Sequence, residues 1–578
     1  MPNMRTFLLI ALLVTGFFLW EAWQRDFHQT PAPATTRDST QASQPATVEP
    51  TSDVPAVQLP SAVAPAAPAT DLPAAPAPAA AAAQTADPGT AKRATRAQIT
   101  ISTDLLMLTI DLQGGTVVDA QLLDYPIAPQ DRSKVVHLLE DSSENFFVAQ
   151  SGFVSAIGTA PTHHSDYVVE GSEFALANGS DSIQVPMSWE SNDGLRVTKI
   201  FKLTRGSYVI EVSHRIDNSG SSTWSASEYR QLQRNSPLLN RKFSFTNPEQ
   251  YSFVGASWYS PEKHYEKLQF EHFADEPLDR AITGGWIAQQ QHYFLAAWIP
   301  PATETARATT AVVDGSGAQR YLVRAMAPAI SVAPGANTTT SSRLYIGPKL
   351  QDHLEEVATG LEYTVDYGMV TILSEPLFWA LKWLHTLTGN WGLAIIFITI
   401  LIKLAFFKLT EAQYRSFAKM RKLTPRLAAL KERYGDDKAK MNQAMMELYQ
   451  KEKINPLGGC LPILVQIPVF IALYWVLLES VELRQAPFFG WIQNLSDKDP
   501  YFILPLLNGL AMFAAQKLTP TAGMDPLQAR MMQMMPIVFS IMFAFFPAGL
   551  VLYWTVNGAL GLAQQWIITK RIEAGETA

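Results

Sequence analysis

Hydrophobic residues along the chain follow three patterns. Near the N-terminus, residues 7–20 (FLLIALLVTGFFLW) are almost entirely apolar. Between about residues 98 and 347, apolar and polar residues alternate in short runs bounded by turn residues, which is typical of β-strands with one buried face. From about residue 387 onward, long apolar runs return. The patterns predict an N-terminal membrane anchor, a β domain and a helical membrane core.

The β pattern is clearest in one hairpin, where residues 195–204 (LRVTKIFKLT) and 208–216 flank the turn Arg205-Gly206-Ser207. Further candidate strands are residues 105–112, 286–299 and 320–325. About 250 residues of such runs, spanning 98–347, predict one large β-sandwich.

The predicted β domain has few residue patterns that indicate catalysis or metal binding. His163 and His164 are neighbours, so on a strand their side chains would point to opposite faces, which is poor geometry for a metal. The sequence has no G-x-S-x-G, H-E-x-x-H or glycine-rich phosphate loop. Its single cysteine, Cys460, excludes an intramolecular disulfide and a cysteine zinc cluster. We therefore expect neither an enzyme nor a resident metal or cofactor.

Residues 391–407 (WGLAIIFITILIKLAFF) contain one charge, Lys403. As a helix they would extend about 26 Å, nearly enough to cross a bilayer. A lysine in mid-span costs roughly 2.5–3.5 kcal/mol, so Lys403 either faces a wet interior or extends to the headgroups. Both interpretations remain open at this point. Thr399 lies four residues earlier and therefore on the same helical face.

Four further apolar segments predict spans: residues 461–478, 502–515, 531–546 and 550–568. Together with residues 391–407 and the anchor at residues 1–27 they give six spans. Most of these spans carry one or two polar side chains, namely Gln466, Asn508, Gln516, Gln533, Asn557 and Gln564. Such sparse polarity suits a narrow wet groove better than a wide pore. Several segments are shorter than the roughly 20 residues of a full span, so they should thin the bilayer locally.

Residues 408–453 form a charged loop with twelve basic residues against six acidic ones, which predicts a cytoplasmic location. A break at Gly435-Asp436-Asp437 predicts an antiparallel helical hairpin. Its charges and methionines, including Lys419, Met420, Arg421 and Asp436, favour docking of a partner over a purely solvated helix pair. Alternation of the spans then places both termini in the cytoplasm and the β domain outside.

Two connecting regions complete the predicted organisation. Residues 28–97 are rich in Pro, Ala, Thr and Ser, which predicts a disordered linker. Residues 348–386 resume a helical pattern, and residues 373–386, with Trp379 and Trp383, resemble an amphipathic helix in the membrane interface. The net charge of −7 argues against direct binding of nucleic acid.

Several motifs in the helical half resemble a known family. They are NWG at 390–392, LTEAQY at 409–414, KM at 419–420, NPLGGC at 455–460, VELRQAPF at 481–488 and PAGLVLY at 547–553. Together they resemble the YidC membrane protein insertases of Gram-negative bacteria. The resemblance implies a polytopic α-helical protein of the bacterial inner membrane, with a five-helix insertase core at residues 387–578 and a periplasmic all-β supersandwich domain.

The resemblance also implies a hydrophilic groove that opens to the cytoplasm and to lipid. Lys403 occupies the position of a groove cation that is usually arginine in the family. Gln466 and Trp554 match groove or substrate-contact positions. Phe470 and Phe543 mark the apolar faces of two spans, along which substrate helices are expected to leave. The cytoplasmic hairpin matches the element that receives substrate.

The resulting prediction is a membrane protein insertase and chaperone that acts alone or with the Sec translocon. Expected partners are nascent membrane proteins, components of the ribosome and signal recognition particle pathway, and the phospholipid bilayer. Only a short acidic stub follows Lys570 and Arg571, which argues against a basic ribosome-binding tail. The alternatives are a small-anion transporter and a membrane-anchored periplasmic carbohydrate-binding protein. The first predicts an internal repeat, which the sequence lacks, and the second leaves the polar residues in the spans unexplained.

Overall fold

The computed structural model describes residues 97–155, 158–236, 252–314, 319–434, 437–452, 461–518 and 526–573. The predicted anchor and nearly all of the predicted linker lie outside these residues. The described chain forms two compact units. The β unit contains residues up to Gly368 together with Leu477–Asp497, and the helical unit contains Met369–Val476 and the residues from Lys498 onward.

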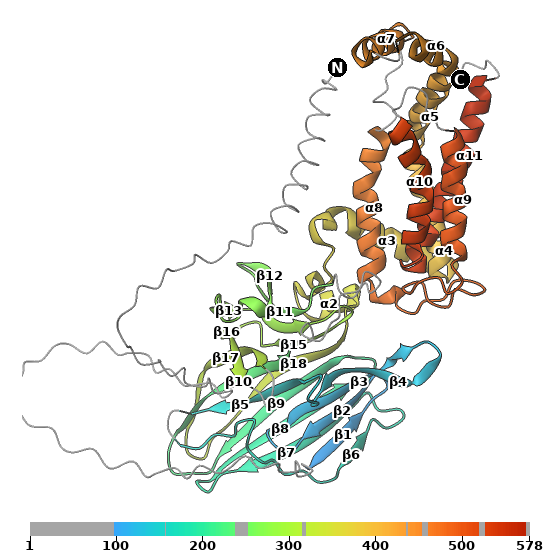
Figure 1. Cartoon of the computed structure of the whole chain (residues 1–578). Coiled ribbons are helices and arrows are strands. Elements are labelled where there is room, and N and C mark those ends of the chain that lie inside the picture. Colours follow the sequence, from blue (N-terminus) through green and yellow to red (C-terminus); the bar gives the residue numbers. More distant parts are fainter. Residues whose placement is uncertain are drawn as a thin grey trace, which may run out of the picture. The chain divides into compact units, whose positions relative to one another are not determined.

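The β unit is a sandwich of two antiparallel sheets, with one short parallel pairing, which confirms the predicted β-sandwich (Figure 1). One sheet has ten strands in the order β13-β16-β17-β10-β5-β4-β3-β2-β1-β6, and the other has eight in the order β12-β11-β14-β15-β18-β9-β8-β7. The strands are β1 (Gln98–Ser102), β2 (Leu106–Asp111), β3 (Thr116–Ala128), β4 (Asp131–Glu140), β5 (Phe147–Val154), β6 (Glu173–Ala175), β7 (Ser182–Glu190), β8 (Leu195–Thr204), β9 (Val209–Asn218), β10 (Trp224–Asn235), β11 (Gly255–Ser260), β12 (His264–Leu268), β13 (Asp279–Thr283), β14 (Trp286–Gln290), β15 (Phe294–Ile299), β16 (Thr305–Asp314), β17 (Gln319–Val332) and β18 (Asn337–Pro348).

The predicted strands are present with one error. β8 has the predicted bounds, and its apolar residues are buried at alternate positions, because strict alternation places one face against the core. The prediction of a single strand at 286–299 is wrong. The chain turns between β14 and β15, where the backbone N–H of Gln291 donates to the carbonyl of Phe294. The turn contains glutamine and histidine rather than glycine or proline, so no turn signal marks it.

A buried lysine connects the two sheets. Lys199 on β8 is 1% exposed, and its Nζ lies 2.9 Å from the carbonyl oxygens of both Gly114 and Gly115. Its distance to the carbonyl oxygen of Ser151, on β5 of the opposite sheet, is 3.2 Å. The φ angles of 77° and 55° at the two glycines allow the turn that presents both carbonyls. Lys199 therefore satisfies backbone groups that would otherwise be buried without a donor.

Replacing Lys199 with methionine should lower the free energy of unfolding of the β unit by about 3 kcal/mol or more. Each buried carbonyl that loses its donor costs roughly 1–3 kcal/mol. Lys202, three residues along the same strand, makes a surface pair with Glu211, so Lys202→Met should cost about 1 kcal/mol or less. Hydrogen exchange of β5 and β8 amides in the full-length protein measures both variants. Equal protection in the two variants would contradict this role for Lys199.

Residues 477–497, the end of helix α8 and the segment after it, belong to the β unit. Ser252 Oγ donates to Glu479 Oε1 at 2.9 Å, and His292 Nε2 donates to the carbonyl of Leu478 at 2.9 Å. The side chains of Arg484 and Gln485 both donate to the carbonyl of Pro126. The sequence patterns did not predict this attachment, because its partners lie far apart in the chain.

Figure 1 also shows the helices, most of which belong to the helical unit. They are α2 (Gln351–Val357), α3 (Thr371–Thr388), α4 (Trp391–Ala405), α5 (Phe407–Lys422), α6 (Thr424–Tyr434), α7 (Lys438–Lys451), α8 (Leu461–Glu479), α9 (Ile503–Leu518), α10 (Pro526–Phe543) and α11 (Ala548–Glu573), with short 3₁₀ turns η3 (Phe270–His272), η4 (Leu361–Thr364), η5 (Gly368–Val370) and η7 (Val481–Leu483). Helix α3 covers the predicted interfacial helix, and both of its tryptophans, Trp379 and Trp383, are exposed.

Among the described helices, none has by itself both the length and the hydropathy of a membrane span. Helices α4 and α5 meet both criteria as a pair, with a bend of 68° between them. Val465–Glu479, Ile503–Leu518 and Arg530–Phe543 are shorter apolar helices. The count of six spans therefore stays a prediction.

Helices α6 and α7 occupy the loop for which the sequence predicts a helical hairpin. Leu423, Leu427 and Tyr449 form a small buried cluster, and Met420 and Met445 pack against it. Arg426 Nη1 pairs with Glu452 Oε1 at 2.6 Å. Asp437 begins α7, since its Oδ1 accepts the backbone N–H of Lys440. Asp436 lies outside the described residues.

Candidate functional site

The candidate site is a polar and small-residue face of helix α11, which packs against α4, α5 and α9. Trp554, Gly558, Gly561 and Gln564 follow one another at intervals of three or four residues, and Asn557 immediately precedes Gly558. At 3.6 residues per turn this spacing keeps all five on one side of the helix. An otherwise apolar helix therefore turns a polar stripe toward its neighbours.

Lys403 reaches this stripe from α4. The helix begins where Asn390 Oδ1 accepts the backbone N–H of Leu393. A β-carbon built at Gly561 would lie 3.5 Å from Lys403 Nζ and 3.2 Å from the Tyr414 hydroxyl of α5. The ammonium group thus lies against α11 where that helix has no side chain. Lys403 is partly buried and makes no hydrogen bond or ion pair with any described residue.

Thr399, one turn before Lys403, is fully buried. Its Oγ1 donates to the carbonyl of Ile395 at 2.6 Å, so its hydrogen-bonding need is met within α4. Asn508 of α9 is 1% exposed and faces the stripe next to Gly558, where a β-carbon would lie 3.7 Å from Asn508 Oδ1. Asn508 Nδ2 contacts the Met512 sulfur at 3.8 Å, a weak interaction.

Buried polar atoms without a protein partner collect on two helices. Among the described residues of the helical unit they are Asn508 Oδ1, Gln516 Nε2, Trp554 Nε1 and Gln564 Nε2, all on α9 or α11. A buried polar atom left unsatisfied costs roughly 1–3 kcal/mol, and folded proteins satisfy nearly all of them. These four atoms are therefore available to hydrogen-bond with groups from outside the described residues.

The two predicted exit residues meet at Trp554. The ring centroids of Phe470 (α8) and Trp554 are 4.7 Å apart, and those of Phe543 (α10) and Trp554 are 5.5 Å apart. Phe543 is buried, and Phe470 is partly buried. Gln466, one turn before Phe470 on α8, is partly buried too. The structure thus brings an aromatic cluster to one end of the polar stripe, and the exit role stays a prediction.

The predicted docking residues lie at the end of α5, which leads into the hairpin. Lys419 and Arg421 are exposed, and Met420 packs against the hairpin cluster. Sequence reasoning missed Tyr414 and Gly561, which share the environment of Lys403. The local signal for the glycine was weak, because a glycine in an apolar helix permits close approach by a neighbour without showing which neighbour it is.

Comparison with known proteins covers both units. Residues 98–380 match the family described as YidC periplasmic domain, and residues 383–575 match the family described as 60Kd inner membrane protein. A protein of Thioalkalivibrio sulfidiphilus named membrane protein insertase YidC is 46% identical over 580 residues, covering 99% of each chain. The chain belongs to the YidC family. A protein of Methylococcus capsulatus, also named membrane protein insertase YidC, is 49% identical over 478 residues, covering 82% of this chain and 86% of that one.

Membership in the YidC family confirms the resemblance that the sequence motifs carry. It makes the chain an inner-membrane protein with a periplasmic domain. A crystal structure described as an active YidC insertase, with its first transmembrane domain resolved, is 20% identical. The similarity covers 81% of this chain and 92% of that chain, with a TM-score of 0.38.

Proposed function

We propose that this protein is a membrane protein insertase whose helical unit receives nascent chains in a polar groove formed by α4, α5, α9 and α11. The insertase function is supported by full-length relatives that carry that name. The observation that carries the groove is the set of buried, unpartnered polar atoms on α9 and α11 beside the unpaired cation of Lys403.

The groove lowers the cost of moving a polar segment across the membrane. In lipid every peptide group of a translocating segment needs a hydrogen-bond partner, and an unpaired one costs several kcal/mol. Asn508, Gln516 and Gln564 present amide groups that pair with water or with the passing chain. The free-energy barrier to translocation falls because polar groups of the segment exchange hydrogen bonds with bulk water for hydrogen bonds in the groove.

The substrate's own hydrophobic helix supplies the driving force. Its transfer into lipid releases about 25 cal/mol per Å² of apolar surface, so no nucleotide is required. The protein lowers the barrier to insertion without catalysing a chemical reaction, in keeping with its family. The aromatic cluster of Phe470, Phe543 and Trp554 offers an apolar surface on which the substrate helix passes from groove to bilayer.

Lys403 selects for charge in this scheme. Its ammonium attracts acidic residues of the translocated segment, and the attraction is stronger than in water because the site is partly buried. Lysine provides a point charge without the bidentate fork of arginine, so it attracts carboxylates without fixing their orientation.

Orientation and partners complete the proposal. The twelve basic residues of 408–453, Lys419 and Arg421 among them, support a cytoplasmic hairpin, and a six-span chain would then have both termini on the same side. In the cytoplasm the hairpin would meet ribosomes, components of the signal recognition particle pathway and the Sec translocon.

Water access to the groove tests the proposal directly. In a Cys460→Ser background, Asn557→Cys, at a partly buried position of the polar stripe, should react with a small maleimide at least about tenfold faster than Leu507→Cys, because the reactive thiolate forms only where water reaches it. Leu507 lies on α9 and is 45% exposed, and the proposal expects lipid rather than water at its side chain. Labelling is measured in membrane vesicles with mass spectrometry. Equal rates at the two positions would exclude a hydrated groove.

A further inference from the structure

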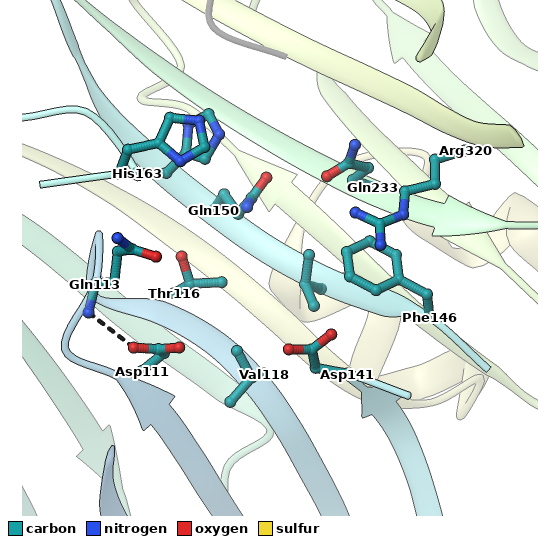
Figure 2. Close-up of a pocket in the computed structure, with 12 residues that line it drawn as sticks. Asp111, Gln113, Thr116, Val118, Asp141, Phe146, Gln150, His163, Gln233 and Arg320 are labelled. Carbon is teal, nitrogen blue, oxygen red and sulfur yellow. Dashed lines mark hydrogen bonds between the residues drawn. The ribbon is translucent and has the colours of Figure 1, made fainter. Parts of the chain in front are cut away.

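The ten-stranded sheet of the β unit contains a second candidate site, unrelated to the helical groove. A cavity of about 130 Å³ opens between side chains of β2, β3, β5, β10 and β17. Figure 2 shows its polar lining, to which Asp111, Thr116, Asp141, Gln150, Gln233 and Arg320 contribute. Val118, Val148 and Phe146 are the apolar side chains in the lining.

Both adjacent histidines line this cavity, with ring centroids 4.1 Å apart. The prediction that His163 and His164 point to opposite faces is wrong, because they lie in a turn rather than in a strand. His163 is buried, and its Nδ1 lies 2.6 Å from the hydroxyl of Tyr229, which also accepts the backbone N–H of His163. The core of the sandwich thus holds this ring in position.

A chain of hydrogen bonds fixes which end of Gln150 faces the cavity. Arg324 Nε donates to Gln231 Oε1 at 2.8 Å, and an arginine can only donate. Gln231 must therefore use its amide nitrogen toward Gln150, and Gln231 Nε2 donates to Gln150 Oε1 at 2.8 Å. The Nε2 of Gln150 keeps both of its N–H donors for the cavity. Gln231 is fully buried and Gln150 is 8% exposed, so the orientation is rigid.

Two more polar side chains are buried at the cavity without a partner. Gln233 is 3% exposed and Thr116 is 5% exposed, and neither side chain makes a hydrogen bond with any residue that the structure describes. An amide and a hydroxyl can each donate and accept. Both groups were removed from water on folding and are left for a ligand or for solvent in the cavity.

The charged groups limit the ligand further. The carboxylates of Asp111 and Asp141 outnumber the single guanidinium of Arg320, which lies over the Phe146 ring at 3.5 Å. Asp111 Oδ1 accepts the backbone N–H of Gln113, which holds the carboxylate at the rim of the cavity. The carboxylates of the lining therefore outweigh its guanidinium, so an anion would be repelled. Only three of the twelve lining side chains are apolar, which is too few to bind a lipid chain or a hydrophobic peptide.

We infer that this cavity binds a neutral polyhydroxylated ligand, namely one sugar unit. A hydroxyl group needs a donor and an acceptor close together, and the lining alternates acceptors (Asp111, Asp141), a donor (Gln150) and groups that do both (Thr116, Gln233). The cavity, at about 130 Å³, has room for several water molecules and therefore for the hydroxyl groups of a small ligand. The ligand would be either a free sugar or the end of an envelope glycan, since both present the same chemistry.

Saturation-transfer NMR on the full-length protein, in a detergent without a sugar headgroup, tests the inference with D-glucose, D-galactose and N-acetyl-D-glucosamine. At least one sugar should bind saturably. Gln150→Glu keeps the acceptor for Gln231 but removes the N–H donors, so it should weaken binding at least about tenfold. Gln233→Leu should do the same. Gln184→Glu, on the exposed surface of β7, should leave binding unchanged.

Each outcome of that experiment decides the question. Absence of saturable binding by all three sugars would overturn the inference, as would equal binding by wild type and both cavity variants. Tighter binding of D-glucuronate than of D-glucose would also overturn it, because an anion site would then be present. Tighter binding of chitotriose than of N-acetyl-D-glucosamine would support the inference and identify a glycan end rather than a free sugar. Unfolding temperatures near that of wild type confirm that the variants fold.

Discussion

Insertion of substrates with acidic translocated segments should fall at least about tenfold when Lys403 is replaced by glutamate, whereas Lys403→Arg should retain most of the activity. Two unit charges 4 Å apart interact by about 4 kcal/mol at an effective dielectric constant of 20. Reversing the sign at residue 403 converts that attraction into repulsion at the same place. Arginine keeps the charge, and Tyr414 and Gly561 leave its neighbourhood otherwise unchanged.

Protease protection of the translocated segment in proteoliposomes measures this effect. A substrate with a neutral segment serves as the control, because it gains nothing from the cation and should insert into both variants at nearly the wild-type rate. For the acidic substrate, insertion by Lys403→Met should be lower than insertion by Lys403→Arg and higher than insertion by Lys403→Glu. If glutamate and arginine impair insertion equally, charge at this position plays no part in the mechanism.

The sequence predicted the site only where a single segment carried the signal. Lys403 is conspicuous because one charge interrupts an apolar run, and no knowledge of neighbouring helices is needed to notice it. Tyr414 and Gly561 could not be found in this way, since their importance arises only from packing of α5 and α11 beside α4. Periodicity reports which residues share a face, and it does not report what lies opposite.

The same limit explains the errors in the β unit. β8 was located at its observed bounds because its alternation is local. The cavity was missed because it gathers residues from Asp111 to Arg320, which are adjacent only through strand order. The histidine pair was misplaced because the strand rule was applied to a turn. Attachment of residues 477–497 to the β unit likewise depends on partners such as Ser252 and Pro126 that no local pattern reveals.

The largest stability effect is expected from a buried ionic cluster in the β unit. Arg230 is 1% exposed, and its guanidinium lies 2.9 Å from Glu228 Oε2 and 2.6 Å from Glu304 Oε1. Arg230→Met should lower the free energy of unfolding of the β unit by about 3–5 kcal/mol, because it leaves two carboxylates without their cation. Arg307→Met, which removes an exposed pair with Asp279, should cost about 1 kcal/mol or less. Hydrogen exchange of β10 amides in the full-length protein distinguishes the two.

The pH dependence of the same cluster gives an independent check. Burial alone would raise the pKa of Glu228, but the charges and hydrogen bonds of Arg230 and His214 outweigh it and lower this pKa to about 2. An unfolded glutamate titrates near 4.5, so the stabilisation is complete above that pH and is lost as the pH falls from about 4.5 toward 2. Arg230→Met removes the main opposing charge, so its exchange-derived stability should fall less steeply over this interval than that of wild type. Parallel pH profiles for the two proteins would show that Arg230 does not set the ionisation of Glu228.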